Sequence, residues 1–413
     1  TETGDLLDEA EKDFTLGSWQ LANLSAMRRK WSHATALSEE LVLALSKASS
    51  RCETVWRSAR AEDNFATVLP YMENLLSLVR ECAQAKSEKL GLSQYDALLD
   101  EYEPGGLSAD IDVRFAELEA FLPNFLGQVL EKQKSDPPPA MPKGPFDVAA
   151  QRSLGLQLMT ALGFDFKHGR LDVSLHPFCG GTPDDVRITT RFDEDDFTSA
   201  IMGVLHETGH GLYERGLPQE WRYQPVGEAL GMAIHESQSL LVEMQMSRSQ
   251  PFLEFAAPLI RDAFGGAGPS WEPQSLYRNL INVEPGVIRV DADEVTYPMH
   301  VILRYRLEKQ MIVGDLALSD LPAAWNDGLE SLLGIRPHND RDGCLQDIHW
   351  YDGAWGYFPT YTLGAMTAAQ LFAAALQSDP QISLGIAKGN FTALITWLGE
   401  NVHSLGCSLG PAN

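Results

Sequence analysis

Apolar residues recur at helical spacing over a long N-terminal stretch, residues 37–132, and this pattern restricts the fold more than any other feature. Within its first part, residues 38–82, only Pro70 interrupts the pattern. Amphipathic helices bury their apolar faces against one another, so the stretch predicts a helical bundle. The segment "SDPPPAMPKGPFD", residues 135–147, cannot continue a helix because its prolines fix φ and lack amide donors. We therefore predict an N-terminal helical region over 1–134 and a second, continuous region over 135–413.

The clearest β signal follows the proline-rich segment. "RLDVSLHPF" and "DVRITTRF" alternate apolar and polar residues on either side of "CGGTPD", which predicts a hairpin with glycines at its turn. The acidic run "DEDDF" then predicts the start of a helix that ends near Gly216 and Pro218. Further helical patterns cover 226–246, 295–313, 319–333 and two C-terminal stretches, "TAAQLFAAALQS" and "GNFTALITWLGENVHSLG". The predicted fold class is mainly α with one small sheet.

Charge and cysteine usage exclude several classes of partner. The chain carries 57 Asp+Glu against 32 Lys+Arg, a formal charge of −25, which repels nucleic acid and anionic membranes. Its five cysteines are far apart and form no CxxC pair, as expected for reduced thiols. No apolar run approaches the ~20 residues of a membrane span, and the acidic start does not resemble a signal peptide. We expect a cytoplasmic protein that binds neither nucleic acid nor membranes.

The stretch "HETGHGLYERGLP" contains the strongest chemical signal. On a helix His206 and His210 project from one face, so both imidazoles can ligate one metal ion. Glu207 then lies beside the ion, where a carboxylate can take a proton from water that the metal activates. A chance match has a frequency on the order of one in fifty. The apolar run "TSAIMGVL" before His206 favours the metal site, because it predicts a buried, rigid helix.

A zinc site of this type needs a third protein ligand. The next predicted helix offers Glu228, Glu236 and Glu243. Glu236 and Glu243 share a face at seven-residue spacing, whereas Glu228 is rotated by about 80° from Glu236. Spacing alone does not choose among the three.

Several further motifs follow one another along the chain. They are "HPF" at 176–178, "DVRIT" at 185–189, "HESQ" at 235–238, "IRVDAD" at 288–293 and "GCLQDIHW" at 343–350. Together with the two histidines, these motifs resemble the carboxypeptidase Taq family of zinc metallocarboxypeptidases. The resemblance extends from about Leu37 to about Gly406. Beyond those limits the chain begins later and ends earlier than family members do, from which we expect a more open groove.

The resemblance implies an elongated, mainly helical peptidase fold with a long groove, like that of neurolysin and the angiotensin-converting enzymes. It implies His206, His210 and Glu236 as metal ligands and Glu207 as general base. The implied activity is removal of C-terminal amino acids from peptides with broad specificity. Zinc is the expected ion, with cobalt possible because nitrogen and oxygen donors accept several divalent ions. A homodimer is also a family expectation, and 135–413 is expected to hold the catalytic residues.

Side chains that contact the substrate are less certain from sequence. His349, Tyr357 and Tyr361 lie in the aromatic segment "DIHWYDGAWGYFPTYTLG" and could stabilise developing charge, although packing under a loop is the alternative. An exopeptidase recognises a free carboxylate, and an arginine fork fits it. Arg289 is the first choice, with a salt bridge to Asp291 or Asp293 as the alternative. Weaker choices are Arg187 and Arg336, and supporting roles are expected for His176, Asp185, His235 and Asp347.

Two rival functions remain open from sequence. One is a helical binding module without catalysis, but such a module has no need of Glu207. The other is an endopeptidase or dipeptidase, and an Arg289 that faces solvent away from the metal would weaken the assignment as a carboxypeptidase. A strand of the hairpin could pair with an extended substrate, which would make specificity broad.

Overall fold

The computed structural model describes residues 2–174 and 177–409, and its contacts divide the chain into two compact units. The first unit comprises Thr1–Ser135 and Val283–Thr362, and the second comprises Asp136–Asn282 and Leu363–Asn413. One division falls beside the proline-rich segment, where the sequence also places a boundary. Residues 283–362 pack with the N-terminal helices, so the stretch 135–413 is distributed over both units.

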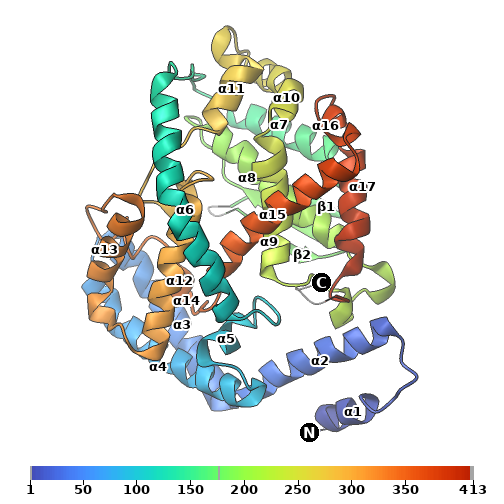
Figure 1. The fold of residues 1–413 in the computed structure, drawn as a ribbon, viewed down its shortest axis with the longest axis vertical. Coiled ribbons are helices and arrows are strands. Elements are labelled where there is room, and N and C mark those ends of the chain that lie inside the picture. The colour runs from blue at the N-terminus through green and yellow to red at the C-terminus, as the bar shows by residue number, and fades with distance from the viewer. Residues whose placement is uncertain (1, 175–176, 410–413) are drawn as a thin grey trace. The chain divides into compact units, whose positions relative to one another are not determined.

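The first unit is built from helices, and its described residues form no strand. Its helices are α1 (Glu2–Ala10), α2 (Ser18–Ala36), α3 (Glu39–Ala61), α4 (Phe65–Leu90), α5 (Gln94–Leu99), α6 (Ser108–Ser135), η5 (Arg289–Asp291), α12 (Tyr297–Val313), η6 (Leu318–Asp320), α13 (Leu321–Leu333) and α14 (His349–Asp352). The blue helices α3 and α4 lie beside the orange α12 and α14, which come from far along the chain (Figure 1). Trp56 of α3 joins these parts, because its indole donates to the carbonyl of Leu345 at 2.9 Å and its ring stacks on Tyr351.

Local caps explain where the N-terminal helices begin and end. The Ser38 hydroxyl accepts from the amide of Leu41 at 3.2 Å and starts α3, and Asn64 starts α4 in the same way. α4 ends at Gly91, whose φ of +69° favours glycine. The helical bundle predicted over 37–132 is confirmed, although α4 continues through Pro70.

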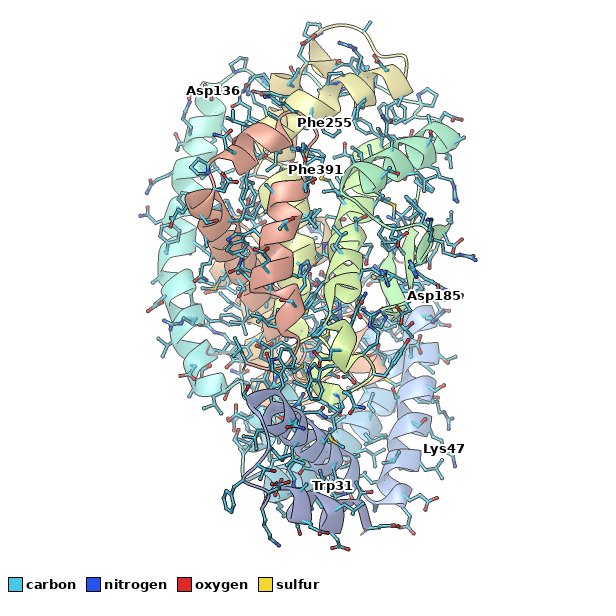
Figure 2. The ribbon with its side chains drawn as sticks, turned by 90° about the vertical axis from the view of Figure 1, so that its right-hand side faces the viewer. Trp31, Lys47, Asp136, Asp185, Phe255 and Phe391 are labelled. Carbon is cyan, nitrogen blue, oxygen red and sulfur yellow. The ribbon has the colours of Figure 1, made fainter. Side chains whose placement is uncertain are left out.

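The second unit combines helices with the small sheet. Its elements are α7 (Val148–Ala161), β1 (Gly169–Val173), β2 (Phe178–Thr182), β3 (Asp185–Thr190), α8 (Phe197–Gly216), η1 (Gln219–Trp221), η2 (Pro225–Gly227), α9 (Met232–Leu240), η3 (Leu241–Ser247), α10 (Gln250–Ala263), η4 (Pro269–Trp271), α11 (Pro273–Leu280), α16 (Gln381–Ile386), α17 (Thr392–Asn401) and η7 (His403–Leu405). α15 (Pro359–Ser378) begins in the first unit and continues into the second. One large apolar cluster joins α7, α8, α10 and α17, and Phe255 meets Phe391 in it at 5.6 Å between ring centroids (Figure 2).

In the parts of the chain that the structure describes, no helix combines the length and the apolar character that a membrane span requires.

The sheet has three strands, and the predicted two-stranded hairpin is therefore wrong. The strand order is β1-β3-β2, with β1 parallel and β2 antiparallel to β3. Gly180 and Gly181 were expected at the turn but lie within β2, and the turn is at Pro183 and Asp184. A Cβ at Gly181 would lie 2.0 Å from the carbonyl oxygen of Asp185. These glycines thus allow close backbone approach, a role that sequence does not distinguish from a turn.

The helix after the sheet begins as predicted, but the next one does not. Asp196 accepts from the amide of Thr198 at 2.8 Å and caps α8. α9 begins at Met232 rather than near residue 226, because a short η2 turn and Gly231, with φ of +147°, come first. After Leu240 the helix continues as the π-helical segment η3. Glu228 is consequently outside the helix and exposed.

α8 and α9 lie against each other (Figure 1), and their backbones come close at Gly209. A Cβ on Gly209 would lie 2.4 Å from the carbonyl oxygen of Gln238 and 2.7 Å from the Cα of Ser239. Both of these contacts are backbone atoms, which cannot turn aside as a flexible side chain can. The absence of a side chain at Gly209 therefore sets the spacing of the two helices.

We predict that Gly209→Ala destabilises the protein by about 1–3 kcal/mol and also weakens divalent-metal binding, because α9 must move away from α8. Gly203→Ala on the same helix is the matched control, since its Cβ would meet only the Thr190 hydroxyl at 3.6 Å. Thermal unfolding and metal titration measure the two effects. Equal metal affinity in both variants would contradict the role given to this approach.

Candidate metal centre

Two packed helices bring His206, His210 and Glu236 together. The histidines lie one turn apart on α8, and Glu236 extends from the facing side of α9. Glu236 and His210 are buried, whereas His206 is partly exposed. Because the apolar residues of α8 belong to the core of the second unit, the helix holds its polar side chains rigidly.

The distances fit a divalent ion. One donor atom from each of the three residues lies within 4.8 Å of the other two. The Nε2 atom of His210 is 3.4 Å from Glu236 Oε2, and the Nε2 atom of His206 is 3.8 Å from Glu236 Oε1. Tetrahedral ligands at ~2.0–2.1 Å from a zinc ion lie roughly 3.3 Å apart. Two imidazole nitrogens and a carboxylate oxygen also leave room for a water molecule or substrate as fourth ligand.

The electrostatics of the cluster favour a cation. Burial opposes charge on His206, but the carboxylates of Glu236 and Glu243 outweigh burial and raise its pKa to about 10. Burial also opposes charge on Glu236, yet His206 and His210 lower its pKa to about 2. For His210, burial prevails and lowers the pKa to about 4. Buried carboxylates beside imidazoles thus demand a positive charge at this position.

The second nitrogen of each histidine has its own partner. Nδ1 of His206 lies 2.9 Å from Glu243 Oε2, and Glu243 in turn pairs with Arg248. Nδ1 of His210 lies 2.6 Å from Nδ1 of His235, whose Nε2 lies 2.9 Å from Glu214. If both ligands donate their Nδ1 protons, each Nε2 lone pair is free for the metal.

This arrangement favours Glu236 among the glutamates that the sequence left open. Glu236 faces both Nε2 atoms, Glu243 faces only the outer nitrogen of His206, and Glu228 is exposed. Glu243 lies in the π-helical segment η3. Its seven-residue spacing from Glu236 signals a shared face, but nothing in the sequence distinguishes a ligand from a partner of a ligand.

Glu207 lies beside the cluster but outside it. It is buried on α8 and forms no hydrogen bond to another described residue. Burial raises its pKa to about 7, while the neighbouring His206 acts in the opposite direction. A carboxylate in this environment exchanges protons near neutral pH, as a general base requires.

In the first unit, Arg289 belongs to a buried network of charges. It pairs with Asp347 at 2.8 Å, and Arg304 pairs with the other oxygen of Asp347 at 2.6 Å. The alternative salt bridge to Asp291 or Asp293 is wrong, because the partner is Asp347 and the carboxylate of Asp293 accepts from the amides of Val295 and Thr296 in the turn before α12. Two arginines share one carboxylate, so this network retains one unit of positive charge. Arg304 was not expected from the sequence, although it lies about two turns into the helix that the sequence predicted.

The aromatic segment also forms a cluster within the first unit. Nε2 of His349 lies 3.0 Å from the Tyr361 hydroxyl, and the rings of His349 and Tyr357 are 5.5 Å apart. Burial lowers the pKa of His349 to about 4, so its imidazole is neutral at pH 7. Its buried Nδ1 has no hydrogen-bond partner among the described residues. All three side chains are partly exposed.

The weaker arginine candidates have surface partners. Arg187 pairs with Asp185 at 2.7 Å on β3, and Arg336 pairs with Asp327 and Glu330. Both arginines are exposed, which does not favour either for carboxylate recognition. His176, expected to support the hairpin, lies outside the described residues.

Two histidines, a glutamate ligand and an adjacent glutamate on packed helices define the donor set of a helical metallopeptidase. Comparison with known proteins agrees. The model of the carboxypeptidase Taq (M32) metallopeptidase family matches residues 1–413. Thermostable carboxypeptidase 1 of Thermus thermophilus is 38% identical over 397 residues, which cover 94% of this chain and 78% of the relative.

Solved structures give the same result. Metallocarboxypeptidase 1 of Trypanosoma cruzi has a TM-score of 0.95 at 40% identity, covering 98% of this chain and 82% of that one. A carboxypeptidase of Pyrococcus furiosus has a TM-score of 0.92 at 34% identity, with the same coverage of both chains. The chain belongs to the carboxypeptidase Taq (M32) family and is a metallocarboxypeptidase, a hydrolase of peptide bonds. The mainly helical fold class with one small sheet is confirmed.

We predict that Glu236→Ala lowers metal affinity by more than the ~10- to 100-fold typical of losing an outer partner of a ligand. Glu228→Ala is the control, because that side chain is exposed. Metal content after dialysis against graded free zinc measures both variants. Loss of metal from Glu228→Ala instead would overturn the assignment of the third ligand.

Proposed function

We propose that the chain is a zinc-dependent carboxypeptidase that removes C-terminal residues from peptides with broad specificity. One observation carries this proposal: His206, His210 and Glu236 converge, and Glu207 lies unpaired beside them. Family membership supports the reaction class and the use of a divalent ion. Zinc is the proposed ion, and cobalt is the alternative that the same donors accept.

A divalent ion at these three residues supplies Lewis acidity, which polarises the scissile carbonyl and makes water more acidic. Glu207 takes a proton from the attacking water as the carbon–oxygen bond forms, and then delivers it to the leaving amine as the carbon–nitrogen bond breaks. His206 and His210 are held for ligation by Glu243 and by His235. Their outer hydrogen bonds fix the imidazole planes and keep Nε2 unprotonated.

Recognition of the terminal carboxylate is assigned to Arg289. The unit of positive charge that it shares with Arg304 and Asp347 supports this role, because a buried cation attracts an anion strongly. His349, Tyr357 and Tyr361 are proposed to donate hydrogen bonds to charge that develops on the substrate. Because His349 is neutral, it can donate a hydrogen bond without competing with Arg289 for the terminal carboxylate of the substrate.

Broad specificity is proposed to come from backbone pairing. β2 is an edge strand, with β3 on one side only. Gly180 and Gly181 have no side chains in the middle of this strand, so an extended peptide can approach the backbone there whatever its sequence. A cytoplasmic location is proposed from the five free cysteines, and a homodimer from the family resemblance alone.

We predict that Glu207→Gln keeps its metal but loses about 10²- to 10⁴-fold in kcat, the contribution of a general base. The exposed Glu220→Gln is the control and should match the parent. Metal analysis and turnover of an unblocked peptide are measured on the same samples. Full activity in Glu207→Gln would remove the proposed base and revive the idea of a binding module.

We predict that Arg289→Lys lowers kcat/KM for peptides with a free C-terminal carboxylate by about 10- to 100-fold, because lysine lacks the bidentate fork. The same peptides with an amidated C-terminus serve as the control and should be poor substrates for both proteins. An endopeptidase would cleave the acid and amide forms equally, and that outcome would exclude this role of Arg289.

A further inference from the structure

Glu308 of α12 is a fully buried carboxylate whose three partners are all donors. Its Oε1 atom accepts from the Tyr95 hydroxyl at 2.8 Å and from the amide of Gly356 at 2.7 Å. Its Oε2 atom accepts from the indole nitrogen of Trp350 at 2.6 Å. Within the described part of the chain, no lysine or arginine pairs with it. A buried charge without a cation is costly, so its retention calls for a reason other than stability.

The partners of Glu308 lie beside the residues assigned to the substrate. Trp350 directly follows His349, and Gly356 directly precedes Tyr357. Trp350 and Gly356 are buried, whereas His349 and Tyr357 are partly exposed. One carboxylate thus contacts both ends of residues 350–356, the end of α14 and the turn after it, which we call the 350–356 loop.

The backbone of this loop depends on that contact. Gly356 has φ of +92°, and a Cβ there would lie 2.8 Å from the backbone of Leu98 and Leu99. The loop therefore passes close to α5, where its amide meets Glu308. Trp350 is enclosed by Trp325 and Trp355, with ring centroids 6.0 and 5.8 Å away.

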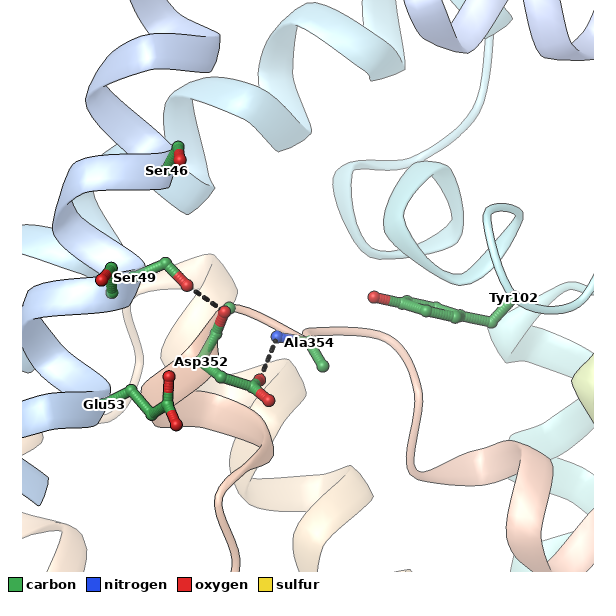
Figure 3. A pocket seen from close by; sticks show the side chains of 8 residues that line it. Ser46, Ser49, Glu53, Tyr102, Asp352 and Ala354 are labelled. Carbon is green, nitrogen blue, oxygen red and sulfur yellow. Dashed lines mark hydrogen bonds between the residues drawn. The ribbon is translucent and has the colours of Figure 1, made fainter. Parts of the chain in front are cut away.

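The middle of the 350–356 loop has separate contacts, while the carbonyl of Trp350 also accepts from the Trp355 indole at 3.2 Å. Ser49 of α3 donates to the carbonyl of Asp352, and the amide of Ala354 donates to the Asp352 carboxylate at 3.1 Å (Figure 3). These contacts line a pocket of about 450 Å³ that also includes Tyr102. The two contacts of Asp352 do not reach Trp350 or Gly356.

We propose that Glu308 is a positioning residue, whose carboxylate fixes the two ends of the 350–356 loop and thereby orients His349 and Tyr357. The proposal rests on the function assigned above to those two side chains. Burial raises the pKa of Glu308 to about 7, although all three donors act against this shift. These donors replace the water that a carboxylate would otherwise bind.

Glu308→Gln separates the hydrogen bonds from the shape of the side chain. A carboxamide has one acceptor oxygen and one NH₂ group. In either orientation of the carboxamide, its NH₂ group faces the indole N–H of Trp350 or the amide N–H of Gly356. Two N–H donors then face each other, and no hydrogen bond forms. One end of the loop is then released while the volume of the core stays the same.

Tyr95→Phe is the matched control. It also removes one hydrogen bond from Glu308, but from α5 rather than from the loop. We expect Glu308→Gln to lower kcat/KM for an unblocked peptide by about 10- to 100-fold, mainly through kcat, since small misplacement of such groups is costly. Tyr95→Phe should stay within about threefold of the parent. Equal losses of kcat/KM in the two variants would show that Glu308 has only a structural role. The same conclusion would follow if the loss of kcat/KM in each variant were proportional to the decrease in its melting temperature.

A double-mutant cycle tests whether Glu308 acts through His349. Glu308→Gln should cost little further activity in a His349→Ala background, because the group that it orients is already absent. Fully additive losses would show that Glu308 acts independently of His349 and would overturn the proposal.

A spectroscopic measurement tests the anchoring of the loop by Glu308 without depending on catalytic activity, and hence independently of the proposed function. The chain has 9 tryptophans, and the 5-fluorotryptophan resonance of Trp350 can be assigned by its loss in Trp350→Phe. Glu308→Gln should shift that resonance, and Tyr95→Phe should leave it in place. An unshifted resonance would overturn the anchoring. A parent protein that does not release C-terminal residues would instead overturn the proposed function, and the fluorine spectrum would still decide the anchoring.

Discussion

The metal centre depends on how closely two helices approach each other. Gly209 lets α8 pass within van der Waals distance of the backbone of α9, and no larger residue fits there. This close approach brings Glu236 to both Nε2 atoms. A glutamate side chain is short compared with the distance between helices that ordinary side chains separate. A glycine between two ligand histidines, which costs helix stability in isolation, is therefore explained by packing. The ligands are a consequence of the helix interface.

Buried charge recurs in both units and is balanced differently in each. In the second unit, carboxylates surround imidazoles, and the cluster favours a cation. In the first unit, Arg289 and Arg304 share Asp347 and favour an anion, while Glu308 is satisfied by neutral donors alone. Each arrangement is costly to bury, and burial of Glu236, Arg289, Arg304 and Glu308 is tolerated because each of these groups has directed partners.

Local features of the sequence predicted local features of the structure. Helical periodicity, the Asp196 cap and the spacing of His206 and His210 depend on neighbouring residues, and the structure agrees with them. Errors arose where a glycine has two uses: Gly181 permits strand pairing rather than a turn. The choice of Glu236 needed either the true start of α9 or the family resemblance. The partnership of Arg289 with Asp347 spans 58 residues of sequence, and no local pattern encodes such a contact.

The central claim is that one divalent ion at His206, His210 and Glu236 drives hydrolysis from the C-terminus of a peptide. Titration of metal-free protein with zinc, followed by mass spectrometry of an unblocked peptide, tests it most directly. Successive loss of single C-terminal residues should appear with added zinc and reach its full rate at about one ion per chain. Internal fragments, or hydrolysis at full rate before zinc is added, would contradict the claim.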